Sequence, residues 1–282
     1  MNNKKEQIMK FVFMASACIS IVTIALMCIF LFSNTVPTLT KIGIRDFILG
    51  TEWKPSAEIF GIFPMIIGSL YVTAGAIIIG VPIGILSAIY IASFCPKKYY
   101  NSLKSTINLL AGIPSIVFGF WGLMVIVPLI RENFHGSGTS ILAASIVLGI
   151  MILPTVINIS ESSIKAVPES YYESSLALGA SHERSIFYAV VPAAKSGIAA
   201  ALILGIGRAL GETLAIVMIA GNQAVIPSSI FKGARTLTSN IVLEMGYAQD
   251  LHRDALIATG TVLFIFILLT NMCFNLIKRR TQ

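Results

Sequence analysis

The sequence predicts an all-α membrane protein, a polytopic helical bundle with six transmembrane helices. Of its 282 residues, 56% are hydrophobic and only 12% are charged, which is too apolar for an ordinary soluble domain. Six apolar runs are each long enough to cross a hydrocarbon core about 30 Å thick, since a helix rises ~1.5 Å per residue. Because backbone groups inside a bilayer must hydrogen-bond within the chain, these runs should be helices.

The predicted helices follow one another along the whole chain. They span residues 11–32, 65–94, 103–130, 140–159, 197–220 and 255–277. Lysines precede the first run, and residues 15–17 mimic a signal-peptidase site, but too few apolar residues lie before that site for a secretory signal. We therefore expect an uncleaved first helix.

Lysine and arginine concentrate in alternate loops, which predicts the orientation in the membrane. The loops on the side that holds both termini carry twelve Lys and Arg and five acidic residues, whereas the other loops carry seven of each. We expect the first side to be cytoplasmic, with both termini inside. The net charge of +7 is then a signal of topology, and no nucleic-acid partner is expected. The scattered cysteines and histidines indicate neither a metal nor a cofactor.

The cytoplasmic segment 161–195 predicts two short helices joined as an elbow. Pro168 is typical of a helix start, Gly179 of a helix stop, and Ser181 of a second start. The segment also keeps apolar and aromatic side chains that a free loop does not need, namely Tyr171, Tyr172, Leu176, Leu178, Ile186, Phe187 and Tyr188. An exposed patch of this kind predicts a docking surface for a partner. A solvated connection that braces the bundle is the alternative.

Arg208 and Glu212 are the only charged residues between 197 and 220. An ionised side chain near the centre of a transmembrane helix costs roughly 2.5–3.5 kcal/mol on insertion scales. On one continuous helix the two residues share a face about one turn apart, so we expect them to face the bundle or a pathway, with either Glu212 or a charge on a partner subunit bonding Arg208. Arg208 would hold an anion transiently, and Glu212 would neutralise it while the pathway is empty. The alternative is a structural ion pair between helices.

The third and fourth apolar runs hold further candidates for a pathway. Pro114 cannot donate a backbone hydrogen bond and should kink its helix, which would present Ser115 and polar backbone. Thr155 and Asn158 add polar side chains to the fourth run. Helix packing and interhelical hydrogen bonds would explain these residues equally well.

The elbow resembles the coupling loop of ABC-importer permeases, whose pattern is Glu-Ala-Ala, three residues, Gly, nine residues, Ile, one residue, Leu-Pro. Here the register is held by Glu173, Ser174, Ser175, Gly179, Ala189, Val191 and Pro192. Both alanines are replaced by serine, the isoleucine by alanine and the leucine by valine. The resemblance implies a type I permease with a MetI-like fold, in which ATPase coupling involves Glu173, Ser174, Ser175, Gly179 and Pro192.

Four further stretches resemble the phosphate-specific Pst importer, and its PstC-type permease more than its PstA-type. They are residues 51–73, 111–123, 205–215 and 236–248. This resemblance implies import of inorganic phosphate by alternating access across a bacterial or archaeal cytoplasmic membrane. It implies four partners: a second homologous permease in a heterodimer, an ABC ATPase homodimer, an extracytoplasmic phosphate-binding protein and membrane lipid.

The resemblance also implies that the chain has two parts and that ATP hydrolysis takes place on another subunit. Residues 1–64 would form the N-terminal helix and an external loop, and residues 65–282 the permease core with the elbow at 161–195. The sequence has no GxxxxGK[ST] phosphate loop, so ATP hydrolysis belongs to a separate chain and this chain is not an enzyme. Two alternatives stay open: a permease for another oxyanion such as molybdate or sulfate, and a scaffold that senses phosphate without conducting it.

Overall fold

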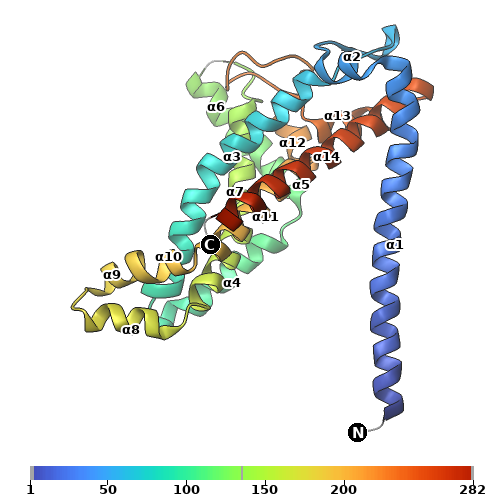
Figure 1. Cartoon of the computed structure of the whole chain (residues 1–282). Coiled ribbons are helices and arrows are strands. Elements are labelled where there is room, and N and C mark those ends of the chain that lie inside the picture. The colour runs from blue at the N-terminus through green and yellow to red at the C-terminus, as the bar shows by residue number, and fades with distance from the viewer. Residues whose placement is uncertain (1–2, 135, 281–282) are drawn as a thin grey trace.

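The computed structural model describes residues 3–134 and 136–280 and is built almost entirely of helices (Figure 1). Within these residues, five helices are long and apolar enough to span a membrane. A sixth span arises if the helical stretches 182–193 and 195–211, which meet at 67°, are taken together. The predicted polytopic helical bundle is confirmed.

The helices and strands have the following bounds. The N-terminal part contains α1 (Asn3–Ile42), α2 (Ile44–Leu49), β1 (Trp53–Lys54), the 3-10 turn η1 (Pro55–Ala57), β2 (Ile59–Phe60), α3 (Phe63–Ile89) and the π-helical η2 (Tyr90–Phe94). The middle part contains α4 (Lys97–Gly112), α5 (Ser115–Trp121), the π-helical η3 (Gly122–Ile126), α6 (Val127–Phe134) and α7 (Ile141–Lys165). The C-terminal part contains α8 (Glu169–Ala177), α9 (His182–Ser185), the π-helical η4 (Ile186–Val190), α10 (Val191–Ala193), α11 (Lys195–Gly211), α12 (Leu214–Ile219), α13 (Leu237–Glu244) and α14 (Asp250–Arg280).

Helices α3 and α7 form the centre of the bundle. A Cβ atom at Gly80 of α3 would lie 2.6 Å from the carbonyl oxygen of Gly149 on α7, so only a glycine permits this approach. Gly84 packs in the same way on Val156. Small residues let two transmembrane backbones come close and gain dispersion contacts, which replace the hydrophobic effect inside lipid.

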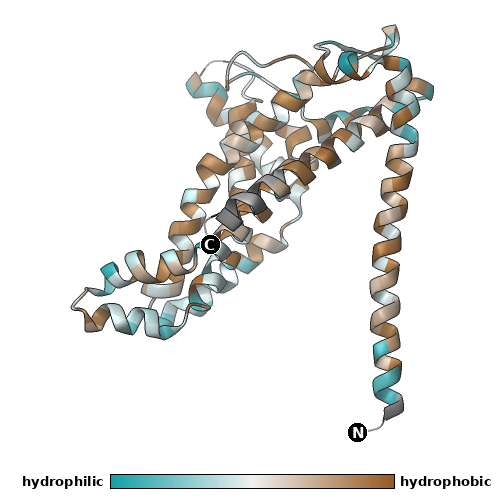
Figure 2. Cartoon of the chain, in the orientation of Figure 1, coloured by the Kyte–Doolittle hydropathy of each residue, from teal (hydrophilic) through white to brown (hydrophobic). Residues whose placement is uncertain are grey.

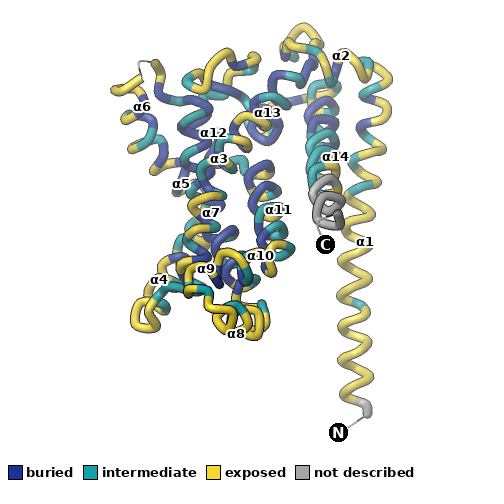
Figure 3. The backbone as a smooth tube through the Cα atoms, turned by 60° about the vertical axis from the view of Figure 1, so that its left-hand side comes forward, coloured by how far each residue is buried: buried dark blue, intermediate teal, exposed yellow. Residues whose placement is uncertain are grey.

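Helix α1 stands apart from the rest of the bundle. It is exposed along most of its length (Figure 3) and hydrophobic over most of its surface (Figure 2). It meets α14 near the end that leads into α2, where the hydroxyls of Thr35 and Thr261 are 2.6 Å apart. An apolar helix without intramolecular cover suits lipid or another membrane helix as its neighbour.

The two ends of the molecule differ as the charge pattern predicts. Helices α4, α8 and α9 lie at one end, together with the start of α1, and α2 and α6 lie at the opposite end (Figure 1). The first end collects the loops with the excess of Lys and Arg.

The third predicted span, a continuous helix over 103–130, is wrong. Helix α4 ends at Gly112, and Ile113 and Pro114 are extended, with ψ angles of 126° and 142°. A proline disfavours the helical conformation of the residue before it and donates no backbone hydrogen bond. The helix therefore ends here and a new one begins, instead of one helix continuing with a kink. The span then begins at Ser115, the first residue of α5.

The fifth predicted span, a continuous helix over 197–220, is also wrong. Helix α11 ends at Gly211, and Glu212 is extended, with φ −69° and ψ 136°. Helix α12 begins only at Leu214. Two of the six predicted spans are therefore interrupted, and Arg208 lies in the last turn before the second interruption.

Candidate functional site

Arg208 is exposed on the surface of this single chain, although it lies on an otherwise apolar helix. Its Nη1 donates to the hydroxyl oxygen of Thr155 on α7 at 3.3 Å. Within the described part of the chain, no ion pair joins Arg208 to an acidic residue. The guanidinium thus keeps its charge and most of its five N–H donors available.

Glu212 does not pair with Arg208 within the described part of this chain, which removes one of the two partners that the sequence leaves open for the arginine. Its Oε1 accepts a hydrogen bond from the backbone N–H of Ala215 at 3.3 Å, in the first turn of α12. Its backbone carbonyl accepts a hydrogen bond from the hydroxyl of Thr238 at 2.9 Å. Glu212 therefore caps the start of α12, where a carboxylate also complements the positive end of the helix.

The sequence contains a local signal for this break. Gly211 is typical of a helix stop, and Thr213, which follows two residues later, is the N-cap residue of α12. The unbroken apolar character on both sides conceals that signal, because hydropathy alone predicts one continuous span.

Ser115 is brought to the level of the second break. A Cβ atom at Gly119 would lie 2.8 Å from Cα of Ala215, and one at Gly122 would lie 3.4 Å from Cγ2 of Ile219. Helices α5 and α12 therefore run side by side in the same direction. Extended back by one turn, this register sets Ser115 at the height of the α11–α12 break. Within the described residues Ser115 makes no hydrogen bond to Arg208 or Glu212.

The two helix breaks thus lie in one layer of the bundle, beside an exposed arginine. Broken helices leave backbone N–H and C=O groups without intrahelical partners. At membrane depth, irregular backbone is tolerated only where it is buried in protein or lines a water-filled cavity. This arrangement can bind an anion through the guanidinium and through peptide groups at the helix ends.

The elbow forms as predicted, with α8 beginning after Pro168 and α9 after Ser181. Gly179 has φ +83°, a conformation that glycine adopts without strain. Its N–H donates to the carbonyl of Leu176 at 2.8 Å, and the N–H of Ala180 donates to that of Ser175 at 3.2 Å. This is a Schellman motif, which ends α8 and turns the chain into α9.

The elbow residues of the predicted coupling motif lie on its surface. Glu173, Ser174 and Pro192 are exposed, and Ser175 is half-buried. Helix α7 continues to Lys165, so the protruding part of the elbow begins at residue 166.

The apolar side chains of the elbow divide into two groups. Ile186 is buried, and the hydroxyl of Tyr172 is 2.8 Å from Nδ1 of His182, which fixes α8 to α9. By contrast, Leu178 is 90% exposed and Tyr188 is 80% exposed. The elbow therefore presents large apolar side chains to its surroundings, as docking surfaces do.

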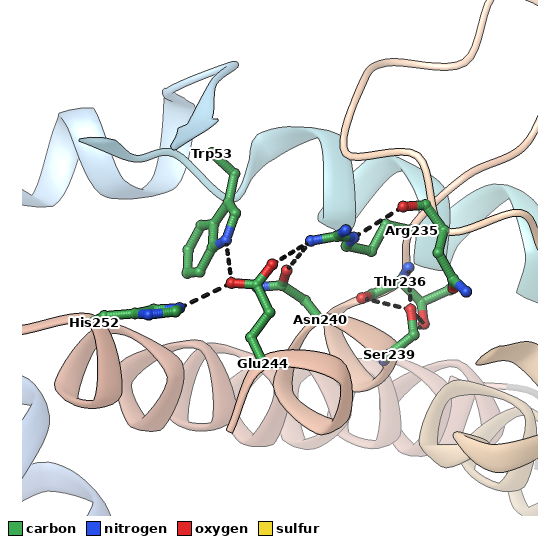
Figure 4. Close-up of polar contacts among 8 residues, drawn as sticks. Trp53, Arg235, Thr236, Ser239, Asn240, Glu244 and His252 are labelled. Atoms are coloured by element: carbon green, nitrogen blue, oxygen red, sulfur yellow. Dashed lines mark hydrogen bonds and ion pairs between the residues drawn. The ribbon is translucent and has the colours of Figure 1, made fainter. Parts of the chain in front are cut away.

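The end of the molecule opposite the elbow is held by a polar network around Glu244 (Figure 4). The buried Glu244 carboxylate accepts hydrogen bonds from Nε1 of Trp53 at 2.8 Å and from Nη1 of Arg235 at 2.6 Å. Its Oε2 lies 2.8 Å from Nε2 of His252. Arg235 also donates to Asn240 at 3.1 Å.

The Glu244 network joins the hairpin β1–β2, the segment before α13, α13 itself and the start of α14. Within the stretch 236–248, α13 begins after Thr236, and Thr236 and Ser239 form a capping box. The partners of Glu244 lie from 8 to 191 residues away, so local patterns do not identify them.

With the geometry described, comparison with known proteins identifies the family. The model of the family described as "Binding-protein-dependent transport system inner membrane component" matches residues 80–282. This chain belongs to that family. It is accordingly a multi-span membrane component of a transport system rather than a catalytic subunit, and the predicted permease class is confirmed.

Related proteins cover most of the chain. The "Probable ABC transporter permease protein YqgH" of Bacillus subtilis is 41% identical over 233 residues, which cover 79% of this chain and 75% of that protein. The "Phosphate transport system permease protein PstC" of Mesorhizobium japonicum is 33% identical over 276 residues, covering 90% of this chain and 84% of that protein.

Solved structures of two transporters share the fold. A chain of the inward-facing MetNI methionine ABC transporter matches with a TM-score of 0.60 and 20% identity, covering 82% of this chain and 100% of that one. A chain of a bacterial ABC transporter for the acidic polysaccharide alginate matches with a TM-score of 0.65 and 17% identity, covering 96% of each chain. The expected MetI-like fold is thereby confirmed.

Proposed function

We propose that this chain is a permease subunit of an ATP-driven importer that moves inorganic phosphate inward by alternating access. The observation that carries the proposal is Arg208, exposed beside two helix breaks at membrane depth. Relatives named as phosphate permeases support the choice of substrate. An arginine offers several N–H donors in a planar fork that matches the oxygens of phosphate.

The geometry changes how Arg208 is expected to work. Since Glu212 caps α12, it does not compete for the guanidinium, which is restrained within this chain by the neutral Thr155. A hydrogen bond to a hydroxyl is weaker than one to a carboxylate. An arriving oxyanion can therefore displace Thr155, and an anion held by few contacts stays free to leave.

The partners follow from the exposed surfaces. The elbow, with Glu173, Gly179 and Pro192, would dock on an ABC ATPase subunit of a homodimer and carry its motion to α7 and α11. The exposed face with Arg208 would meet the second permease, so that the pathway lies between the two subunits. An extracytoplasmic phosphate-binding protein would deliver the anion at the end that carries α2 and α6. In this orientation both termini are cytoplasmic.

The experiment that tests the function is transport by the purified complex in proteoliposomes, with the binding protein outside and ATP available to the ATPase. We expect uptake of labelled phosphate that stops without ATP or without this chain. Preferred uptake of sulfate or molybdate would assign a different oxyanion. Normal uptake in membranes that lack this chain would contradict conduction and favour a sensor.

The elbow gives a separate prediction. Leu178→Asp should reduce co-purification of the ATPase subunit about tenfold or more, because a charge replaces a side chain that is almost fully exposed and available for apolar contact. The fold should not change, since Leu178 makes little contact within the chain. Tyr247→Asp, at an exposed site far from the elbow, is the matched control. Equal loss in both variants would contradict a docking role.

A further inference from the structure

A strip of polar side chains continues from Arg208 along the helices α7 and α4. Helix α7 contributes Thr155, Asn158 and Glu161 at intervals of three residues, and α4 contributes Tyr100, Lys104 and Asn108 at intervals of four. Both spacings keep side chains on one face of a helix. We call these six residues the polar strip.

The two halves of the polar strip are joined by direct contacts. Nζ of Lys104 donates to Oδ1 of Asn158 at 2.8 Å and forms an ion pair with Oε2 of Glu161. The amide nitrogen of Asn158 donates to Oδ1 of Asn108 at 3.2 Å. Tyr100 donates its hydroxyl hydrogen to Oε1 of Glu161 at 2.7 Å.

The polar strip does not suit a surface that faces lipid. Thr155 and Asn158 lie within α7, a candidate membrane span over 141–165, where polar side chains face protein or water, and Lys104 and Glu161 lie at the elbow end of that span. Nevertheless Asn108 is exposed in this chain and Lys104 keeps 26% of its side chain accessible. The strip therefore faces the same partner or water-filled space as Arg208.

The charges of the polar strip leave Lys104 free to change partners. Glu161 is only 2% exposed and has a second cation, Lys165, whose Nζ lies 2.9 Å from Oε1. If Lys104 turned away, Lys165 and Tyr100 would still satisfy the buried carboxylate. The usual penalty for an unpaired buried charge would then be small. An ammonium group has three donors, and Lys104 uses two of them here.

We infer that Lys104, together with Asn158 and Asn108, forms a second oxyanion contact on the elbow side of Arg208, with Glu161 as the counter-charge. This inference rests on the proposed phosphate pathway. Asn158 is three residues along α7 from Thr155, the partner of Arg208, which is about 4.5 Å of helix rise. An anion leaving Arg208 passes to the ammonium of Lys104, and Glu161 recaptures Lys104 when the anion is released.

The experiment measures phosphate uptake by the complete complex in proteoliposomes. Lys104→Gln should lower the rate about tenfold or more at normal assembly, the effect expected for one charge-assisted hydrogen bond. Lys104→Arg keeps the positive charge and should retain most of the rate. Lys98→Gln, which removes an exposed cation from the same helix outside the polar strip, is the matched control.

The double variant Lys104→Gln with Glu161→Gln separates transport from structure. It removes both charges of the Lys104–Glu161 pair, and Lys165, whose side chain is 42% exposed, can turn to water, so a purely structural pair would be dispensable and uptake would recover. We expect no recovery, because the anion contact is still missing. Recovery, unchanged uptake in Lys104→Gln, or loss of assembly in both variants would overturn the inference. If the unmodified complex failed to transport phosphate, the proposed function itself would fail instead.

Discussion

Arg208→Gln is expected to lower phosphate uptake about 10- to 100-fold while the complex assembles normally. A hydrogen bond to a charged group contributes roughly 1.5–3 kcal/mol, and each ~1.4 kcal/mol corresponds to a factor of ten. The substitution removes the charge that attracts the anion but keeps a polar side chain that can still bond Thr155. The measurement is uptake of labelled phosphate per amount of assembled complex in the same membranes.

Two controls make the Arg208 result specific. Arg131→Gln removes an exposed arginine at the other end of the molecule and should not affect uptake. Glu212→Gln should reduce uptake much less than Arg208→Gln, because an amide oxygen can still accept the hydrogen bond from Ala215. Equal losses in Glu212→Gln and Arg208→Gln would instead restore the ion-pair hypothesis. Unchanged uptake in Arg208→Gln would rule out the anion contact.

Glu244→Ala is expected to destabilise the end of the molecule opposite the elbow by about 3–5 kcal/mol, the usual effect of removing one partner from a buried ion pair. It leaves the indole N–H of Trp53 without its acceptor and removes the charged partner of Arg235, which keeps its hydrogen bonds to Asn240 and to the carbonyl of Asn222. Thr238, which holds the carbonyl of Glu212, belongs to the same helix α13. Loss of order in α13 should therefore also weaken the hydrogen bond from Thr238 that holds Glu212 at the second helix break.

Trp53 allows this change to be observed directly. The chain has two tryptophans, so Trp121→Phe leaves Trp53 as the single fluorophore. In this background, Glu244→Ala should lower the thermal midpoint and make Trp53 accessible to iodide quenching. Glu132→Ala, at an exposed position of α6, should change neither quantity. An unchanged midpoint together with unchanged quenching would show that the Glu244 network is not stabilising.

The sequence by itself determined the features that depend on local patterns. Apolar runs of sufficient length predict membrane spans, because lipid offers no hydrogen-bond partners and a helix satisfies the backbone N–H and C=O groups within the run. The elbow was also predictable, since Pro168, Gly179 and Ser181 specify its helix starts and stop through the chain's own backbone.

Only the tertiary structure decided how the charged residues are paired. Arg208 and Glu212 are four residues apart and would pair on a regular helix, but the break at Gly211 turns Glu212 towards α12 instead. Lys104 bonds Glu161, which is 57 residues away in the sequence. Trp53 bonds Glu244, which is 191 residues away. Such contacts exist because packed helices bring distant side chains within reach, whereas sequence patterns report only on neighbours within a few turns.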